Sequence, residues 1–320
     1  MHFATAITDC PDVYDRDVYD DITQQFRDLD PKLQHFLGAV ASVSPFLTDL
    51  LRKEHTWLRE RLDAIKIDQS IEIEDTDDIG AALRSAKRRV ALWTALCDFS
   101  GIWQVEQVCA MLTDFADRAV QCAFDHAISQ QIARGKLPGL ARDAHPHDTG
   151  LFVLAMGKMG AGELNYSSDI DLICLFDEAR FPVDDFFDAR AALIKATRTA
   201  TALLNDITSD GYVFRTDLRL RPDPAVTPVC MGVEAAEQYY ESLGRTWERA
   251  AYIKARVCAG DQVAGEAFLK SMRPFVWRKH LDFAAIQDAH AMRIGYREKI
   301  GQSRITSISG HNVKLGLGGI

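Results

Sequence analysis

A glycine-rich loop between two apolar segments is the feature that most constrains the fold of this chain. Residues 151–156 form an apolar run of strand length, and the loop after it holds Gly157, Gly160 and Gly162 within six residues. Glycine allows a sharp turn and lets backbone N–H groups approach an anion closely. A second strand-like run follows at residues 169–176. We therefore predict two strands joined by a loop that is suited to phosphate.

Two aspartates, Asp169 and Asp171, stand at the start of the second run. Alternate residues of a strand point to the same face of a sheet, so these carboxylates are expected to lie side by side. Two negative charges so close are costly unless a divalent cation lies between them. Ser167 and Ser168 come directly before them and supply hydroxyls suited to phosphate oxygens. Either motif alone is more often a plain turn or a solvated pair, but joined after an apolar strand they indicate an Mg²⁺ and phosphate site.

A third carboxylate lies on a strand predicted at residues 212–220. On such a strand Arg215, Asp217 and Arg219 share one face. In an isolated strand this pattern would more often be a plain ladder of ion pairs. Beside the other two acids, however, Asp217 becomes a candidate third metal ligand. Two metal ions held by three acids, with arginines for the phosphates, are suited to in-line displacement at phosphorus.

Periodic apolar residues predict helices before and after this region. Asp77 and Asp78 are both candidates for the N-cap of a helix that carries Arg84. Another helix is expected at residues 185–208. The clearest apolar stripe consists of Val108, Leu112, Phe115, Ala119 and Cys122.

These patterns divide the chain into four parts. We expect an acidic mobile tail at residues 1–14 and a helical domain over residues 15–140. A catalytic domain with the acidic strands follows over residues 150–260. Residues 261–320 are expected to begin a C-terminal helical element that is cut short.

Composition limits the class of protein. The chain has 320 residues and a formal net charge of −9, and an acidic chain does not attract nucleic acid or an anionic membrane through its overall field. No apolar run approaches the roughly 18–20 residues of a membrane span, and the N-terminus lacks the pattern of a signal peptide. Seven scattered cysteines without a CxxC pair favour reduced, mostly buried thiols. We therefore expect a cytoplasmic protein that binds neither nucleic acid nor a membrane.

The motifs resemble one known family. The ordered run from Gly157 to Ile173 is similar to the bifunctional glutamine synthetase adenylyltransferase/adenylyl-removing enzymes, which belong to the polymerase-β-type nucleotidyltransferase superfamily. The resemblance begins near Arg84 and implies an α+β fold. That fold is a nucleotidyltransferase-type mixed β-sheet core with flanking helices, preceded by an N-terminal helical domain and followed by truncated helices. Further segments that fit the family are residues 219–222, 244–249, 253–256, 273–278 and 312–320.

The resemblance also implies a reaction. The loop has the form found in the N-terminal, adenylyl-removing half of that family, which uses inorganic phosphate to remove AMP from a tyrosine of glutamine synthetase and releases ADP. This reaction regulates nitrogen assimilation. The implied partners are glutamine synthetase and a regulatory protein of the PII type. Because the second catalytic domain of the family is absent from the sequence, the chain is expected to be a fragment of a longer multifunctional enzyme.

The implied site residues form two groups. Asp169, Asp171 and Asp217 would be the catalytic residues and would hold Mg²⁺, with two ions expected. The second group would bind the nucleotide (the ATP, ADP or AMP moiety) and the phosphate co-substrate. It consists of Gly157, Lys158, Gly160, Gly162, Ser167, Ser168, Arg219 and Arg221.

Other interpretations stay open. The three acids cannot separate AMP removal from adenylyl transfer out of ATP, because both reactions pass through the same kind of phosphorus centre. The chain could also be an inactive module that binds the PII-type protein, and residues 272–304 offer either a basic docking surface or a solvated helix face. An unrelated Asp-x-Asp glycosyltransferase explains neither Asp217 nor the serine pair. The roles left open are those of Lys158, Arg249, Lys254 and Arg256.

Overall fold

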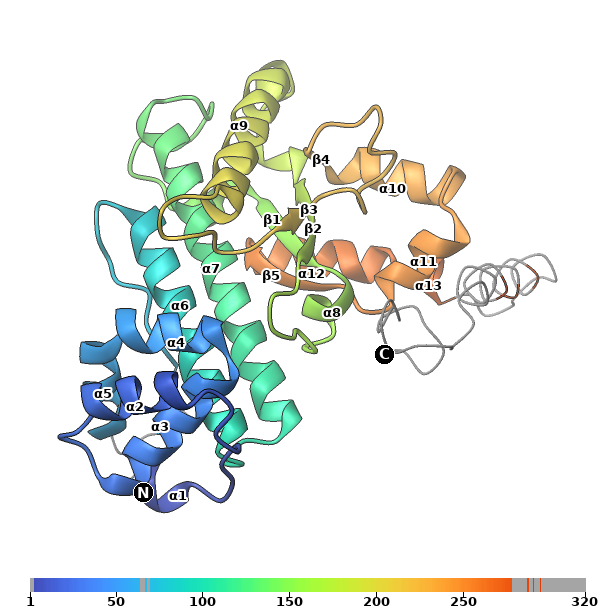
Figure 1. The fold of residues 1–320 in the computed structure, drawn as a ribbon. Coiled ribbons are helices and arrows are strands. Elements are labelled where there is room, and N and C mark those ends of the chain that lie inside the picture. The colour runs from blue at the N-terminus through green and yellow to red at the C-terminus, as the bar shows by residue number, and fades with distance from the viewer. Residues whose placement is uncertain are drawn as a thin grey trace.

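The computed structural model describes residues 3–63, 67 and 70–277, together with the single positions 287, 290 and 294. Helices occupy most of the chain before the first strand (Figure 1). They are α1 (Phe3–Ala6), α2 (Arg16–Gln25), α3 (Pro31–Val43), α4 (Pro45–Lys53), α5 (His55–Asp63), α6 (Ile79–Phe99) and α7 (Val105–Ala133).

Local signals explain where the two longest of these helices lie. The Asp78 carboxylate accepts a hydrogen bond from the Ala81 amide at 3.0 Å, so Asp78 rather than Asp77 caps α6. A cap of this kind contributes about 1 kcal/mol to helix stability. Along α7 the predicted stripe is confirmed, because four of its five residues are buried and Cys122 is half-buried.

A mixed five-stranded sheet follows, in the order β3-β2-β1-β5, with β4 pairing with β2 off this path. β1 runs antiparallel to β2 and to β5, whereas β2 runs parallel to β3 and to β4. The fold is therefore α+β, as predicted. The strands are β1 (Leu151–Ala155), β2 (Ile170–Phe176), β3 (Thr216–Asp217), β4 (Cys230–Gly232) and β5 (Arg256–Gly260).

Both faces of the sheet are buried, because side chains alternate between two hydrophobic clusters. On one face, Val153 and Cys174 join a large cluster that continues through α7 into the N-terminal helices. On the other face, Leu154 and Ile173 pack in a second cluster with Phe268. Helices α7 and α9 (Phe186–Asn205) cover the first face, and α10 (Val233–Ser242) and α12 (Gln262–Ser271) cover the second (Figure 1).

Shorter elements connect these layers. The chain between β1 and β2 contains a single helical turn, α8 (Gly157–Gly160). Before β1 lies the 3-10 turn η1 (Pro146–Thr149), and η2 (Glu178–Arg180) and η3 (Val183–Asp185) follow β2. After α10 come α11 (Thr246–Tyr252) and, beyond α12, α13 (Arg273–Val276).

One predicted strand is much shorter than expected. In place of a strand over residues 212–220, only Thr216 and Asp217 pair with β2. The strand ends there because the Asp217 carboxylate accepts the Arg219 amide at 2.8 Å, which turns the chain. Arg219 therefore reaches Asp217 across a turn and not along one face of a strand.

Three further predictions concern the cysteines, membrane-spanning helices and the domain boundaries. All seven cysteines lie within the described residues, none of them forms a disulfide, and four of them are buried. None of the described helices is both long and apolar enough to cross a membrane. The domain boundaries stay a prediction, and one hydrophobic cluster runs from the N-terminal helices into the sheet.

Candidate active site

Two of the predicted carboxylates lie opposite one another on neighbouring strands. The parallel register of β2 and β3 places Asp171 beside Asp217. The Ile170 amide donates to the Arg215 carbonyl oxygen at 2.9 Å and so helps to hold this register. Asp169 comes directly before β2 and lines the same cavity as Asp217. Acids that are far apart in the sequence are thereby brought to one edge of the sheet.

The Asp217 carboxylate is engaged by Arg219. The Arg219 guanidinium donates to it from Nε at 2.9 and 3.0 Å and from Nη2 at 2.5 Å. These charge-assisted hydrogen bonds hold the pKa of the Asp217 carboxyl below its ordinary value. The Arg219 side chain is itself 83% exposed, so it can leave Asp217 without breaking any packing.

The three acids have the chemistry of a magnesium site, since carboxylate oxygens are the ligands that Mg²⁺ prefers. In the part of the chain that the structure describes, however, no three His, Cys, Asp or Glu side chains already form a group that could hold a metal ion. A cation bound at Asp217 would compete with the Arg219 guanidinium for the same oxygens. The metal triad of Asp169, Asp171 and Asp217 therefore stays a prediction.

A cavity of about 630 Å³ opens beside these acids. Arg198, Arg215 and Arg219 line it together with Asp169 and Asp217. Cations and carboxylates in one open cavity are suited to a ligand that carries phosphate groups and a metal ion. The remaining lining residues are Thr201, Ala202, Asn205, Asp206, Thr216 and Leu218.

At two positions of the loop other groups lie so close that only glycine, which has no side chain, fits. Gly157 has φ of +56°, and a Cβ there would lie 2.8 Å from Oδ2 of Asp171. The missing side chain thus leaves room for the Asp171 carboxylate against the loop. A Cβ on Gly160 would overlap the carbonyl oxygen of Lys254 and lie 2.6 Å from that of Ala155. The loop can therefore pack against the chain before β5 only with glycine at this position.

The amides expected to hold phosphate already have partners. The Gly160 N–H donates to the Met156 carbonyl at 2.9 Å, and the Gly162 N–H donates to the Met159 carbonyl at 3.2 Å. A phosphate at these amides would have to compete with the hydrogen bonds of the turn. Phosphate binding by this loop therefore stays a prediction.

The serine pair forms a turn of its own. Ser167 has φ of +54°, a left-handed conformation that is uncommon for a residue with a side chain. The Ser168 hydroxyl donates to Oδ1 of Asn165, and Arg215 Nη2 donates to the Ser167 carbonyl at 2.8 Å. Arg215 therefore ties this turn to β3.

The other basic candidates differ in their surroundings. Arg221 donates to the carbonyl oxygens of Leu218, Pro224 and Thr227, so it holds the loop after β3 together. Lys158 is half-buried in α8. Lys254 and Arg256 are both in ion pairs: Lys254 pairs with Glu163 and Arg256 with Asp117, each at 2.8 Å.

The sequence of this chain is similar to those of known proteins. The family model described as "Glutamate-ammonia ligase adenylyltransferase" matches residues 34–271. The chain belongs to this family. It is 48% identical over 299 residues to a "Bifunctional glutamine synthetase adenylyltransferase/adenylyl-removing enzyme" of Bradyrhizobium sp. (strain ORS 278), covering 89% of this chain and 30% of that protein. The predicted family is thereby confirmed.

Two other relatives carry the same name. The protein of Rhodopseudomonas palustris (strain ATCC BAA-98 / CGA009) is 46% identical over 301 residues, which cover 91% of this chain and 30% of that protein. The protein of Rhizobium meliloti (strain 1021) is 43% identical over 307 residues, which cover 91% of this chain and 31% of that protein. The chain thus spans about a third of the length of these relatives.

In this glutamate-ammonia ligase adenylyltransferase family member, one side of the cavity consists of residues that were not predicted as site residues from the sequence. Arg198, Thr201 and Asn205 project into it from α9. Their spacing of three and four residues was available in the sequence and places them on one face of a helix.

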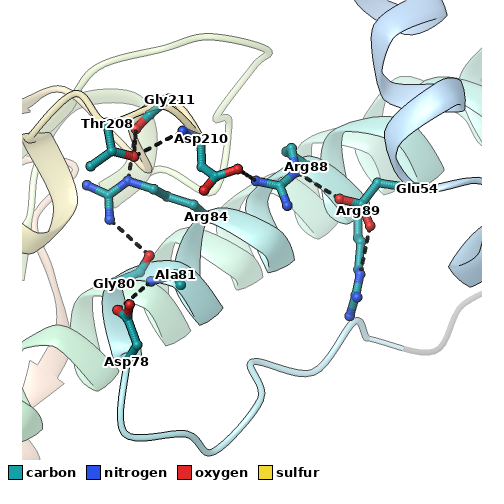
Figure 2. A network of polar contacts seen from close by, with 10 residues as sticks. All are labelled: Glu54, Asp78, Gly80, Ala81, Arg84, Arg88, Arg89, Thr208, Asp210 and Gly211. Atoms are coloured by element: carbon teal, nitrogen blue, oxygen red, sulfur yellow. Dashed lines mark hydrogen bonds and ion pairs between the residues drawn. The ribbon is translucent and has the colours of Figure 1, made fainter.

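A second contribution that the sequence did not reveal comes from α6. Arg84 is 5% exposed and donates to three backbone carbonyls, those of Gly80 at 2.9 Å, Gly211 at 2.8 Å and Asp206 at 2.6 Å. Figure 2 shows Arg84 pointing from the helix to the turn that ends in Gly211. Arg84 thus clamps both ends of the turn between α9 and β3.

The neighbouring side chains of α6 reinforce this clamp (Figure 2). Arg88 donates to Asp210 at 3.2 Å and to the buried Glu54 at 2.7 Å. Arg89 donates to the other oxygen of Glu54 at 3.1 Å. The helical region therefore positions the turn that leads to Asp217.

We expect Arg84→Met to lower both the stability and the activity of this family member. Its loss removes the Arg84 donor from the Asp206 carbonyl and one of three donors from the Gly211 carbonyl, which should reduce the free energy of unfolding by about 1–3 kcal/mol. If the clamp positions Asp217, turnover should also fall at least about tenfold, equivalent to roughly 1.4 kcal/mol. Chemical denaturation and a turnover assay at a temperature where the variant is folded measure the two effects.

Arg59→Met is the matched control. Arg59 also donates to a carbonyl of its own helix, His55 O at 3.3 Å, and to the carbonyl of a distant residue, Gln25 O at 2.8 Å. It does so within the N-terminal helices and touches no residue of the cavity. A similar stability loss with unchanged turnover is expected for this variant. Equal turnover in both variants would contradict a positioning role for Arg84.

Proposed function

We propose that the chain removes AMP from an adenylylated tyrosine of glutamine synthetase by Mg²⁺-dependent phosphorolysis. The observation that carries this proposal is the pairing of Asp171 with Asp217 at the edge of a cavity that three arginines line. The relatives' name supports the same reaction class, since it joins adenylyl transfer with adenylyl removal. The loop form described above favours the removing direction.

The chemistry balances as one displacement at phosphorus. An oxygen of inorganic phosphate forms a bond to the phosphorus of the AMP group, and the bond from that phosphorus to the tyrosine oxygen breaks. The products are ADP and the tyrosine, whose oxygen takes up a proton. Because the nucleophile is an anion, the reaction needs positive charge to bring two anions together more than it needs a strong base.

This chain's own residues can supply that charge. Arg198 and Arg215 line the cavity, and Arg219 lies at its edge on Asp217. A guanidinium presents a fork of donors that matches phosphate oxygens. Arg219 is exposed and can exchange the Asp217 carboxylate for a phosphate. Such an exchange would free the Asp217 oxygens at the same time.

Mg²⁺ is part of the proposal. Asp169, Asp171 and Asp217 would hold it, and when bound it would neutralise charge on the transferred phosphoryl group. The chain's acids and arginines then act as opposite halves of one site. The acids bind and orient the cation, and the arginines bind and orient the two phosphate groups.

Two reactions run in parallel test the proposed direction. One mixture holds the chain, adenylylated glutamine synthetase, inorganic phosphate and Mg²⁺, and ADP release is measured. The other holds unmodified glutamine synthetase and radiolabelled ATP, and labelled protein is measured. The proposal expects ADP in the first and no labelling in the second. Labelling without ADP release would instead favour adenylyl transfer, and neither product, from a folded chain that binds its partners, would favour a binding module.

Cellular setting and regulation belong to the same proposal. Cysteines that form no disulfide and are largely buried are typical of a reducing compartment, so we place the chain in the cytoplasm with glutamine synthetase. A regulatory protein of the PII type is the proposed second partner. Most of the basic segment at residues 272–304 lies outside the described residues.

A further inference from the structure

Lys87 of α6 lies on aromatic rings in the seam between the N-terminal helices and the chain before β3. Its ammonium nitrogen is 4.0 Å from the centre of the Phe214 ring and 5.8 Å from that of Phe115. No carboxylate among the described residues forms an ion pair with it, and no hydrogen bond to it occurs there. A cation that has left water without a carboxylate partner is costly. Burial accordingly lowers the pKa of the Lys87 ammonium to about 8.

Two cavities meet at this side chain. One has a volume of about 410 Å³ and the other of about 230 Å³, and Lys87, Phe46, Ala91 and Ser167 line both. Neither shares a lining residue with the cavity beside Asp217. The ammonium group is therefore placed where a ligand from solvent can reach it, separately from the carboxylate site.

The larger cavity offers the groups that bind a phosphate. Lys53 and Arg88 add two cations, and the hydroxyl-bearing residues Ser168, Thr208 and Ser209 line the same space. Arg88 is already paired with Glu54 and Asp210, whereas Lys53 has no ion pair within the described residues. The other charged or titratable groups that line the two cavities are Asp49, Asp98, Asp210, Tyr166 and Tyr212.

The charges in the larger cavity favour an anion. Arg88 and Asp210 are paired with one another, and of the remaining charges Lys53 and Lys87 outnumber Asp49. Phe46, Phe214 and Tyr212 supply aromatic walls to this cavity, and the Phe214 ring lies against the ammonium group. An anion in this setting would receive a charge-assisted hydrogen bond at low local dielectric.

We propose that Lys87, with Lys53 and the hydroxyls of Ser167 and Ser209, forms a second oxyanion site that binds a phosphate group. The phosphate can come from inorganic phosphate or from a nucleotide, whose base would lie against the aromatic walls. The site adjoins the catalytic acids through the Ser168–Asp169 peptide. Its existence does not depend on the proposed reaction, because binding needs neither Mg²⁺ nor glutamine synthetase.

Binding to the intact chain tests this site in the absence of Mg²⁺. Calorimetry with inorganic phosphate, AMP and adenosine is run on the unaltered chain, on Lys87→Gln and on Lys136→Gln. Lys136 is an exposed lysine outside both cavities, so its loss of charge is the matched control. We expect Lys87→Gln to lose at least tenfold in phosphate or AMP affinity and Lys136→Gln to stay within twofold. Equal affinity in both variants would overturn the site.

An NMR titration of the Lys87 ammonium group gives an independent readout. A bound phosphate favours the charged form, so it should raise the Lys87 pKa by at least one unit, and binding should weaken as the pH rises above 8. AMP binding at least tenfold tighter than inorganic phosphate identifies a nucleotide as the source, and equal affinities identify the free ion. If the Lys87 pKa is unchanged at saturating phosphate and AMP, the proposed site is wrong and the Lys87 ammonium group only contacts aromatic rings.

A third variant distinguishes the effects of this site from those of the carboxylate site. Asp169→Asn with Asp171→Asn should keep phosphate affinity within about threefold while losing turnover. Loss of turnover in that variant together with loss of binding in Lys87→Gln supports both sites. If instead AMP removal fails in the unaltered chain but Lys87-dependent binding persists, the proposed reaction is wrong and the oxyanion site stands.

Discussion

Replacing both Asp169 and Asp171 by asparagine should reduce ADP release from adenylylated glutamine synthetase at least about a thousandfold, roughly 4 kcal/mol of transition-state stabilisation. Asparagine keeps the shape of the side chain but removes the charge that a Mg²⁺ ion requires. Because Asp169 is exposed and Asp171 half-buried at the edge of the sheet, the fold should be retained. The assay measures initial rates at saturating Mg²⁺ and phosphate.

Asp188→Asn is the matched control for this variant. Asp188 is an exposed acid in the first turn of α9 and does not line the cavity. Its loss of charge should change turnover by no more than about twofold, because surface substitutions of this kind usually shift stability by less than 0.5 kcal/mol. Retention of Mg²⁺-dependent ADP release in the double variant would show that these carboxylates do not hold the catalytic metal.

Gly160→Ala should destabilise the chain more than any other single methyl group added to the loop. The new Cβ would overlap the Lys254 carbonyl oxygen and crowd that of Ala155, and both are backbone atoms that cannot rotate away. Forced overpacking of this kind typically costs about 1–3 kcal/mol, occasionally more. Since Gly160 lies between β1 and β2, the shift should also misplace Asp171 and lower turnover. Urea denaturation gives the change in the free energy of unfolding.

Gly162→Ala separates this overlap from the effect of losing a glycine. Gly162 has φ of +75°, but a Cβ there would meet no atom within 4 Å. Only the conformational penalty of a left-handed residue applies, which is about 1–2 kcal/mol. We therefore expect the smaller loss from this variant. Equal losses would mean that the approach of Lys254 to the loop does not constrain residue 160.

Several structural features could be predicted because their signals are local. The apolar stripe of α7, an N-cap of α6 at Asp77 or Asp78, and the apolar runs that became β1 and β2 all depend on residues near one another in the sequence. The position of Asp217 beside Asp171 was expected as well, although the strand that carries it is only two residues long.

Other features could not be predicted because they depend on side chains from separate segments. In the sequence Arg84 is only one basic residue of a predicted helix. Its role in the clamp depends on the carbonyls of Asp206 and Gly211, which are 122 and 127 residues away. The turn at Arg219 depends on which oxygens the Asp217 carboxylate can accept from. Lys87 is distinctive only because Phe115 and Phe214 enclose it.

The family, the α+β class and the candidate acids could be read from the sequence alone, because residue types and short spacings carry that information. The environment of each charge is visible only in the folded chain, where Asp217 pairs with Arg219, Arg84 donates to backbone carbonyls and Lys87 lies on aromatic rings. The physical reason is that the energy of a charge depends on its distance to other charges and to water. Those distances exist only once separate segments have packed together.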